Sequence, residues 1–186
     1  MMRRWMVGAL VLLLALSVIG WIFYMPPSAL NMLKPVPAHA RIVYQSDTPG
    51  WFLSFFPTLG TCRRQANPWE KSFQTLEKSP LAVASVALGG RGRRDTWVAV
   101  SAVGRRAVFL RWQLVFAPPE GVKPSRPYGA WPVWQYSDPS LPAWMCIRFS
   151  VAEGLLICSI SDDSHDIYDL LDTLDGRRPS ADRKEK

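Results

Sequence analysis

The feature that most constrains this chain is an uncharged apolar run of 19 residues at positions 6–24, MVGALVLLLALSVIGWIFY. At about 1.5 Å of rise per helical residue, a run of this length covers roughly the hydrocarbon core of a bilayer. Two arginines precede it, and its far end carries Trp21, Phe23 and Tyr24, whose rings favour the boundary between membrane and water. The pattern predicts a transmembrane signal anchor over residues 1–25.

A cleaved signal peptide is the alternative interpretation, because Ala38-His39-Ala40 matches the small-residue pattern of a cleavage site. That site lies 16 residues beyond Tyr24, and the apolar run is longer than the core of about 7–15 residues in a usual signal peptide. We therefore expect an uncleaved anchor. Positive charges on the two sides nearly balance, and we expect a short N-terminal tail inside with the domain exported.

Composition limits what the rest of the chain can be. It has 186 residues, of which 48% are hydrophobic and 20% charged, which excludes a disordered chain. The 16 prolines and 12 glycines exclude a coiled coil or a simple helical bundle, since both residues interrupt helical periodicity. We expect a proline-containing linker over 26–40, one domain over 41–178 and a polar tail over 179–186.

The domain is predicted to be α+β, an antiparallel sheet with helices packed on one face. Strand patterns of β-branched and aromatic residues alternate with turn signals, whereas capping residues begin the helices. The predicted strands are 41–45, a three-strand meander of 81–88, 96–103 and 106–116, and a hairpin of 144–151 and 155–160. The predicted helices are 48–59, 67–78 and 167–174, and the stretch 118–142, with seven prolines, is expected to be loop or edge strand.

The hairpin carries an alternating apolar pattern and two of the three cysteines. If Gly154 takes the left-handed position of a short turn, Val151 faces Leu155 and one uniformly apolar face meets the helices. The two cysteines then share a face diagonally, and a disulfide would need a register shift of two residues, so their pairing stays open. Cys62, in a predicted loop, is expected to be an unpaired thiol. The apolar face comprises Met145, Ile147, Phe149, Val151, Leu155 and Ile157, and the cysteines are Cys146 and Cys158.

The last helix has the clearest pattern. Ile167, Leu170, Leu171 and Leu174 follow the spacing of one buried helical face, and Gly176 stands where a left-handed C-terminal cap belongs.

Catalytic motifs are scarce. The chain has two histidines, His39 in the predicted linker and His165, and it has no nucleophile elbow, phosphate loop or dinucleotide fingerprint. One metal hypothesis exists, because carboxylates and an imidazole cluster at the start of the last helix and suit a divalent ion. The alternative is structural: acids favour a helix N-terminus, and Asp166, Asp169 and Asp172 are expected on its solvent face. The candidate ligands are Asp162, Asp163, His165, Asp166 and Asp169.

Two groups of surface residues are candidate ligand or partner contacts. Arginine clusters account for most of the net charge of +7 and suit anionic lipid headgroups or an envelope protein, while export makes nucleic acid an unexpected partner. Aromatic residues among prolines can stack on sugars or hold peptides, or they can cover a core beneath a loop. The candidates are Arg91, Arg93, Arg94, Arg105, Arg106, Trp131, Trp134, Tyr136 and Trp144.

Three segments resemble a class of bacterial membrane-anchored extracytoplasmic proteins of unknown function. They are the Pro-x-x-Ala-type segment 35–40 leading into the strand at 41–45, the segment 154–159, and Leu170-Leu171-Asp172 of the last helix. The resemblance implies an exported α+β domain on a single-pass anchor in the inner membrane, without established catalysis or cofactor. The sequence thus favours a non-catalytic, membrane-tethered interaction or structural module, and the alternative is a membrane-tethered metal-dependent hydrolase.

Overall fold

The computed structural model describes residues 8, 10–14, 16, 30–46, 79–87 and 95–182. Both helices predicted within 48–78, together with Cys62, lie outside these residues. Three candidate arginines, Arg91, Arg93 and Arg94, also lie outside them. Most of the predicted anchor falls outside as well, and within the described ranges no helix has the length and apolarity needed to cross a membrane.

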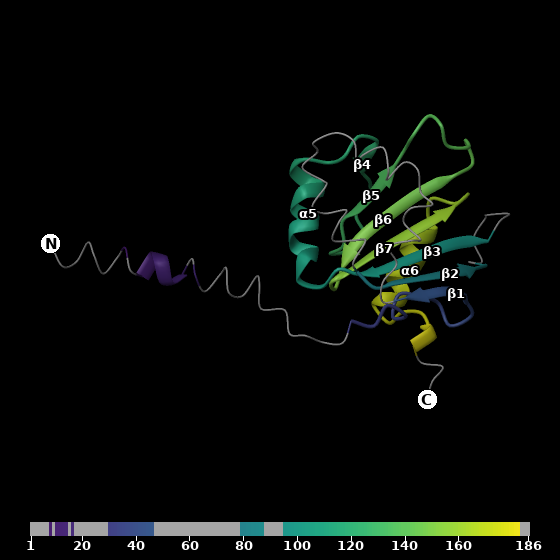
Figure 1. The fold of residues 1–186 in the computed structure, drawn as a ribbon, viewed down its shortest axis with the longest axis horizontal. Helices are drawn as coiled ribbons and strands as arrows, with labels where there is room; N and C mark the ends of the chain where they lie inside the picture. Colours follow the sequence, from purple (N-terminus) through teal and green to yellow (C-terminus); the bar gives the residue numbers. More distant parts are fainter. Residues whose placement is uncertain are drawn as a thin grey trace.

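The domain is an α+β fold built on one antiparallel sheet of seven strands, as the sequence predicts at the level of fold class (Figure 1). The strand order is β1-β2-β3-β7-β6-β5-β4, so β3 and β7 join two antiparallel groups at the middle of the sheet. The strands are β1 Arg41–Ser46, β2 Leu81–Val86, β3 Thr96–Ala102, β4 Val122–Pro124, β5 Val133–Tyr136, β6 Cys146–Ala152 and β7 Leu155–Ser161. The helices are α5 Ala107–Phe116 and α6 Asp166–Leu174. The short strands β4 and β5 lie in the proline-rich stretch at one edge, where the sequence expects edge strand or loop.

The predicted register of the β6–β7 hairpin is wrong by one residue. Glu153 and Gly154 both take positive φ, +48° and +78°, and form a two-residue turn that pairs Ala152 with Leu155 and Val151 with Leu156. Such a two-residue turn matches the right-handed twist of the flanking strands. Because side chains alternate along a strand, the expected uniform apolar face is split between the two faces of the sheet.

The register also separates the two cysteines. Cys146 pairs with Ser161 and Phe149 pairs with Cys158, which puts the cysteines on opposite faces of the sheet. Both are free thiols.

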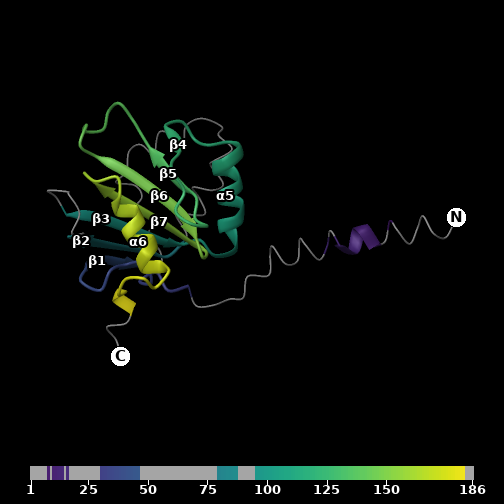
Figure 2. The same ribbon diagram turned by 180° about the vertical axis from the view of Figure 1, so that it is seen from behind.

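The main core lies between one face of the sheet and α6, which covers that face in Figure 2. All four predicted apolar residues of the helix, Ile167, Leu170, Leu171 and Leu174, are at most 1% exposed, and Gly176 ends the helix with a φ of +77°. Their partners on the sheet are Ala82, Ala84, Val98, Val100, Val133, Ala152, Leu155 and Ile157. The predicted buried face and cap of this helix are therefore confirmed.

The third strand of the predicted meander is instead a helix. After β3, a 3-10 turn over Gly104–Arg106 leads into α5, and β7 takes the place beside β3 that the meander assigned to 106–116. The segment 107–116 is apolar at almost every position, so its pattern does not distinguish a buried strand from a helix.

The two helices also do not share a face. Leu110 and Leu114 of α5 form a second core with Trp134 and Val151, and Val151 projects from the face opposite α6. The prediction of helices on one face is therefore wrong.

Residues 30–40, predicted to be a linker, are part of the domain. Met32 and Val36 are 8% and 1% exposed and belong to the main core. Backbone hydrogen bonds from Ala181 N to Val36 O and from Ala38 N to Pro179 O tie this segment to the end of the chain. The predicted polar tail therefore begins with packed residues, since Ser180 and Ala181 are buried. Pro35 and Pro37 suit this segment because its backbone donors include Lys34, Val36 and Ala38, which alternate with the prolines.

Candidate functional site

The predicted metal ligands do not converge. Asp166 is 4% exposed and accepts a hydrogen bond from the Thr96 hydroxyl, so its prediction on the solvent face is wrong. Asp169 pairs with Arg178 at 2.7 Å, and burial raises the pKa of Asp169 although the arginine lowers it. Asp163 accepts hydrogen bonds from the backbone and ring of His165, whose side chain is 78% exposed.

Across the described ranges, no three His, Cys, Asp or Glu side chains form a group that could hold a metal ion. Asp162, the remaining candidate ligand, is half-buried just before α6. Each acid of α6 that was considered as a ligand has a structural partner instead.

The outer side of α6 is covered by the loop between β4 and β5. The Tyr128 hydroxyl donates to Asp172, and Trp131 Nε1 donates to Asp175 Oδ1 at 3.0 Å. Arg177 completes this network, because its guanidinium donates to both Tyr128 and Asp172 and lies 5.6 Å from the centre of the Tyr128 ring. The hydrogen bond to Asp172 raises the pKa of Tyr128, since a phenolate beside a carboxylate is disfavoured.

The predicted aromatic surface is divided by this arrangement. Trp134 is 2% exposed and stacks on Phe149, so it is a core residue and the prediction of a contact surface there is wrong. Trp131 is half-buried against α6, with Arg111 5.9 Å from its ring centre. Tyr136 donates to Asp138 at 3.0 Å. Trp144 is the most exposed of the four candidates, at 41%.

The two cysteines are poor nucleophiles. Burial raises the pKa of Cys158 to about 12 and also raises the pKa of Cys146. A thiolate is the reactive form, and at neutral pH neither side chain supplies it readily. A cysteine nucleophile also needs a general base beside it. His165, the histidine nearest to these cysteines in the sequence, contacts Asp163 and Ser164 instead.

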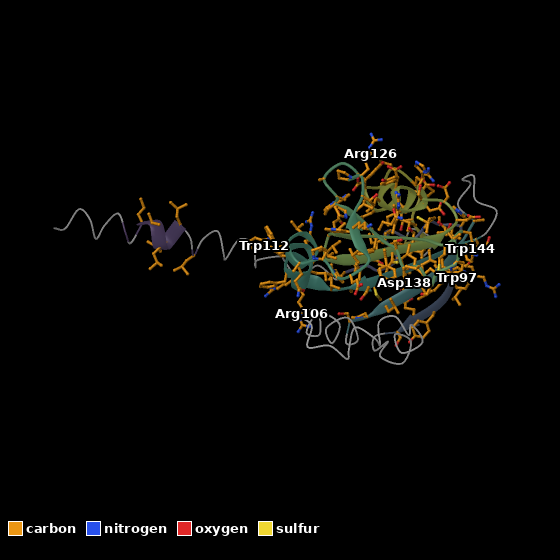
Figure 3. The ribbon with its side chains drawn as sticks, turned by 90° about the horizontal axis from the view of Figure 1, so that it is seen from above. Trp97, Arg106, Trp112, Arg126, Asp138 and Trp144 are labelled. Carbon is orange, nitrogen blue, oxygen red and sulfur yellow. The ribbon has the colours of Figure 1, made fainter. Side chains whose placement is uncertain are left out.

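The outer face of α5 exposes large apolar side chains, which the sequence prediction missed. Trp112 is 62% exposed, Val115 60% and Phe116 78%, and Trp112 packs edge-on against Phe116 with ring centres 6.0 Å apart. Figure 3 shows Trp112 pointing away from the sheet. The sequence could have predicted this face. If the segment 107–116 is a helix, its apolar residues lie on more than one side, and a single core can bury only one of them.

Arg105 and Arg106, two predicted contact residues, stand at the amino end of this helix. Both are exposed and lie in the 3-10 turn directly before α5. Gly104, which opens the turn, has a φ of +59°, a conformation that glycine adopts without strain. These two arginines and the exposed apolar side chains of the helix are together called the α5 surface: Arg105, Arg106, Trp112, Val115 and Phe116.

The chain enters the domain beside this surface. A Leu30 methyl carbon lies 3.7 Å from where a Cβ on Gly104 would stand, and another lies 3.0 Å from the corresponding position on Gly154. Leu30 also packs against the main core. Leu30, six residues after the end of the apolar run at 6–24, thus packs at the amino end of α5.

Comparison with known proteins assigns no family to the chain: no family model, no curated protein and no solved structure matches it.

Proposed function

We propose that this protein is a non-catalytic interaction or structural module of a bacterial cell envelope. In this proposal residues 6–24 anchor it in the inner membrane, and its domain lies on the extracytoplasmic side. The observation that carries the proposal is the packing of residues 30–40 into the domain core, with Val36 1% exposed. An apolar run long enough to span a bilayer is thereby joined to a folded domain through the five residues 25–29.

The same packing argues against cleavage after Ala40. Cleavage there removes Met32 and Val36 from the core and takes Pro37 away from its bridge to Ser180. Losing buried apolar side chains costs several kcal/mol in total, of the order of the whole stability of a small domain. The domain is therefore expected to keep the segment that connects it to the anchor.

A non-catalytic role is supported by the partners of the acidic residues. Two of the carboxylates considered for a hydrolase have partners within the fold: Asp166 accepts from Thr96, and Asp169 pairs with Arg178. No observation favours the metal-dependent hydrolase over this role. The partner in the proposal is an envelope protein or anionic lipid headgroups, and its expected contact is at the exposed arginines.

The test uses the full chain with a C-terminal tag, expressed in a bacterium. We expect the protein to stay in the membrane pellet after an alkaline wash, to retain its N-terminal residues by mass spectrometry, and to be digested when protease is added to spheroplasts. Leu12→Arg places a charge in the apolar run and should shift the protein to the supernatant, since a charge at the bilayer centre costs about 3 kcal/mol or more.

Leu12→Phe is the matched control, because it changes the same position and keeps the run apolar. A full-length protein that is washed into the supernatant, or a mature chain that begins at Arg41, would contradict the anchor. Protection of the tag in intact spheroplasts would reverse the proposed orientation.

A further inference from the structure

α5 carries apolar side chains on both its inner and its outer face. Its inner face, Ala107, Leu110 and Leu114, is buried in the second core. Its outer face still carries Trp112 and Phe116, four residues apart and more than 60% exposed. Soluble surfaces seldom keep large aromatic side chains together in water.

The charges on this helix and in the turn before it are positive. From Thr96 to Pro119 the chain contains three arginines and no acidic residue. Glu153 lies in the neighbouring turn, where Gly154 O accepts a hydrogen bond from Gly104 N, and its carboxylate is paired with Lys34 at 2.5 Å. Arg105 and Arg106 are exposed at the amino end of the helix, and Arg111 lies along its side over Trp131. Apolar and aromatic side chains flanked by arginines are the composition of helices that lie in a membrane interface, where phosphate groups attract the guanidinium groups.

The chain length places this helix close to the membrane. Six Cα-to-Cα steps separate Tyr24, at the end of the apolar run, from Leu30, which packs beside Gly104. Fully extended, six residues span about 20 Å at most. If residues 6–24 span the bilayer, the Cα of Leu30, whose side chain contacts the amino end of α5, cannot be farther than about 20 Å from the membrane boundary, whatever path residues 25–29 take.

We propose that the α5 surface is a second membrane contact that lies on anionic lipid. Trp112, Val115 and Phe116 enter the headgroup region, and Arg105 and Arg106 bind lipid phosphates. This inference rests on the proposed anchor and extends it, because two contacts fix the orientation of the domain where one leaves it free to rotate. Trp97 and Trp144, at the far end of the sheet from Trp112 in Figure 3, then face away from the membrane.

Site-specific photocrosslinking in the full chain tests the orientation. A benzophenone side chain is introduced at Phe116, and in a matched control at Trp97, which is also an exposed aromatic residue, at 47%. The protein is reconstituted in phosphatidylcholine vesicles with or without phosphatidylglycerol, irradiated, washed at alkaline pH and examined by mass spectrometry. We expect lipid adducts at 116 to exceed those at 97 several-fold and to increase with phosphatidylglycerol.

The charge-reversal variant Arg105→Glu/Arg106→Glu should lower the adduct yield at 116 by on the order of tenfold or more, since each basic residue near an anionic surface contributes appreciably to binding. Equal adducts at 116 and 97, or crosslinks from 116 to protein, including a second copy, in place of lipid, would overturn the inference while leaving the anchor intact. If the alkaline wash releases the protein from the membrane, the proposed anchor is wrong. The inference about α5 is then wrong as well, because the anchor is what holds α5 at the membrane surface.

Discussion

The two domain helices that the structure describes, α5 and α6, use their side chains in opposite ways. α6 buries one apolar face completely, and its outer side is bonded to the loop between β4 and β5 through Tyr128 and Asp172. α5 buries three residues and leaves Trp112 and Phe116 in solvent. Both helices are of similar length, so length does not account for the difference. The outer side of α6 contributes to the stability of the domain, whereas the outer side of α5 is available for contact outside it.

The largest expected effect concerns Cys158, on the face of the sheet that α5 covers. With a pKa of about 12, Cys158 in a Cys62→Ser/Cys146→Ser background should react with a thiol reagent at pH 8 on the order of 10³ times more slowly when folded than in denaturant. Stopped-flow absorbance measures both rates. The raised pKa also means that the free energy of unfolding falls as the pH rises above about 9, because only the unfolded thiol ionises there. Comparable folded and unfolded rates would show that the Cys158 face is open.

Truncation of one leucine in each helix compares the two cores directly. Leu170→Ala should lower the free energy of unfolding by about 2–5 kcal/mol, because Leu170 is fully buried in the main core. Leu110→Ala, at an 8% exposed position in the smaller core, should cost less, about 1–3 kcal/mol. Urea unfolding of the full chain in a mild detergent gives both values. A larger loss for Leu110→Ala would reverse the ranking of the two helices.

The start of α6 depends on a buried polar pair. Thr96→Val removes the hydroxyl that donates to Asp166 and leaves a buried carboxylate without that donor, at an expected cost of about 1–3 kcal/mol. The double variant Thr96→Val/Asp166→Ala is the control, because removing both partners should cost less than the sum of the single changes. Strict additivity in this cycle would mean that the two residues do not stabilise each other.

The turn beside α5 should be sensitive to Leu30. Gly154→Ala introduces a Cβ 3.0 Å from a Leu30 methyl carbon at a φ of +78°, and we expect a loss of about 1–2 kcal/mol. Gly129→Ala is the matched control, because Gly129 also has positive φ and nothing lies within 4 Å of the new Cβ. The difference between their melting temperatures reports the contact with Leu30. Equal losses would indicate that Leu30 is not fixed at the amino end of α5.

The smallest expected effect concerns the outer face of α5. Trp112→Ser or Phe116→Ser should change the free energy of unfolding by no more than about 0.5 kcal/mol, as is usual for exposed positions. The same changes should weaken membrane contact, so stability and binding are separated by one substitution. A loss of 2 kcal/mol or more, as roughly expected for a buried aromatic residue, would show that this face is covered within the protein.

The sequence prediction was most accurate where one local pattern has one structural solution. The spacing of Ile167, Leu170, Leu171 and Leu174, followed by Gly176, predicted the buried face and the end of α6. The content of β-branched and aromatic residues predicted β1, β2 and β3 to within a few residues. In α6 the side-chain period, set by local backbone geometry, is also the period of burial.

The candidate site was less predictable. The prediction of Trp134 as a contact residue failed because an aromatic residue among prolines suits either a surface platform or a covered core, and only the partner Phe149 decides between them. Arg105 and Arg106 were named correctly as exposed residues. The apolar half of the same surface was missed because α5 was predicted to be a strand.

The sequence by itself therefore determined the apolar run at 6–24, the α+β class and the buried face of α6, since each follows from the order and period of neighbouring residues. The tertiary structure decided the register of the β6–β7 hairpin, the burial of Asp166, the packing of residues 30–40 and the helical state of α5. These depend on contacts between segments far apart in the chain. Such contacts select among local conformations that differ by only about 1 kcal/mol or less per residue.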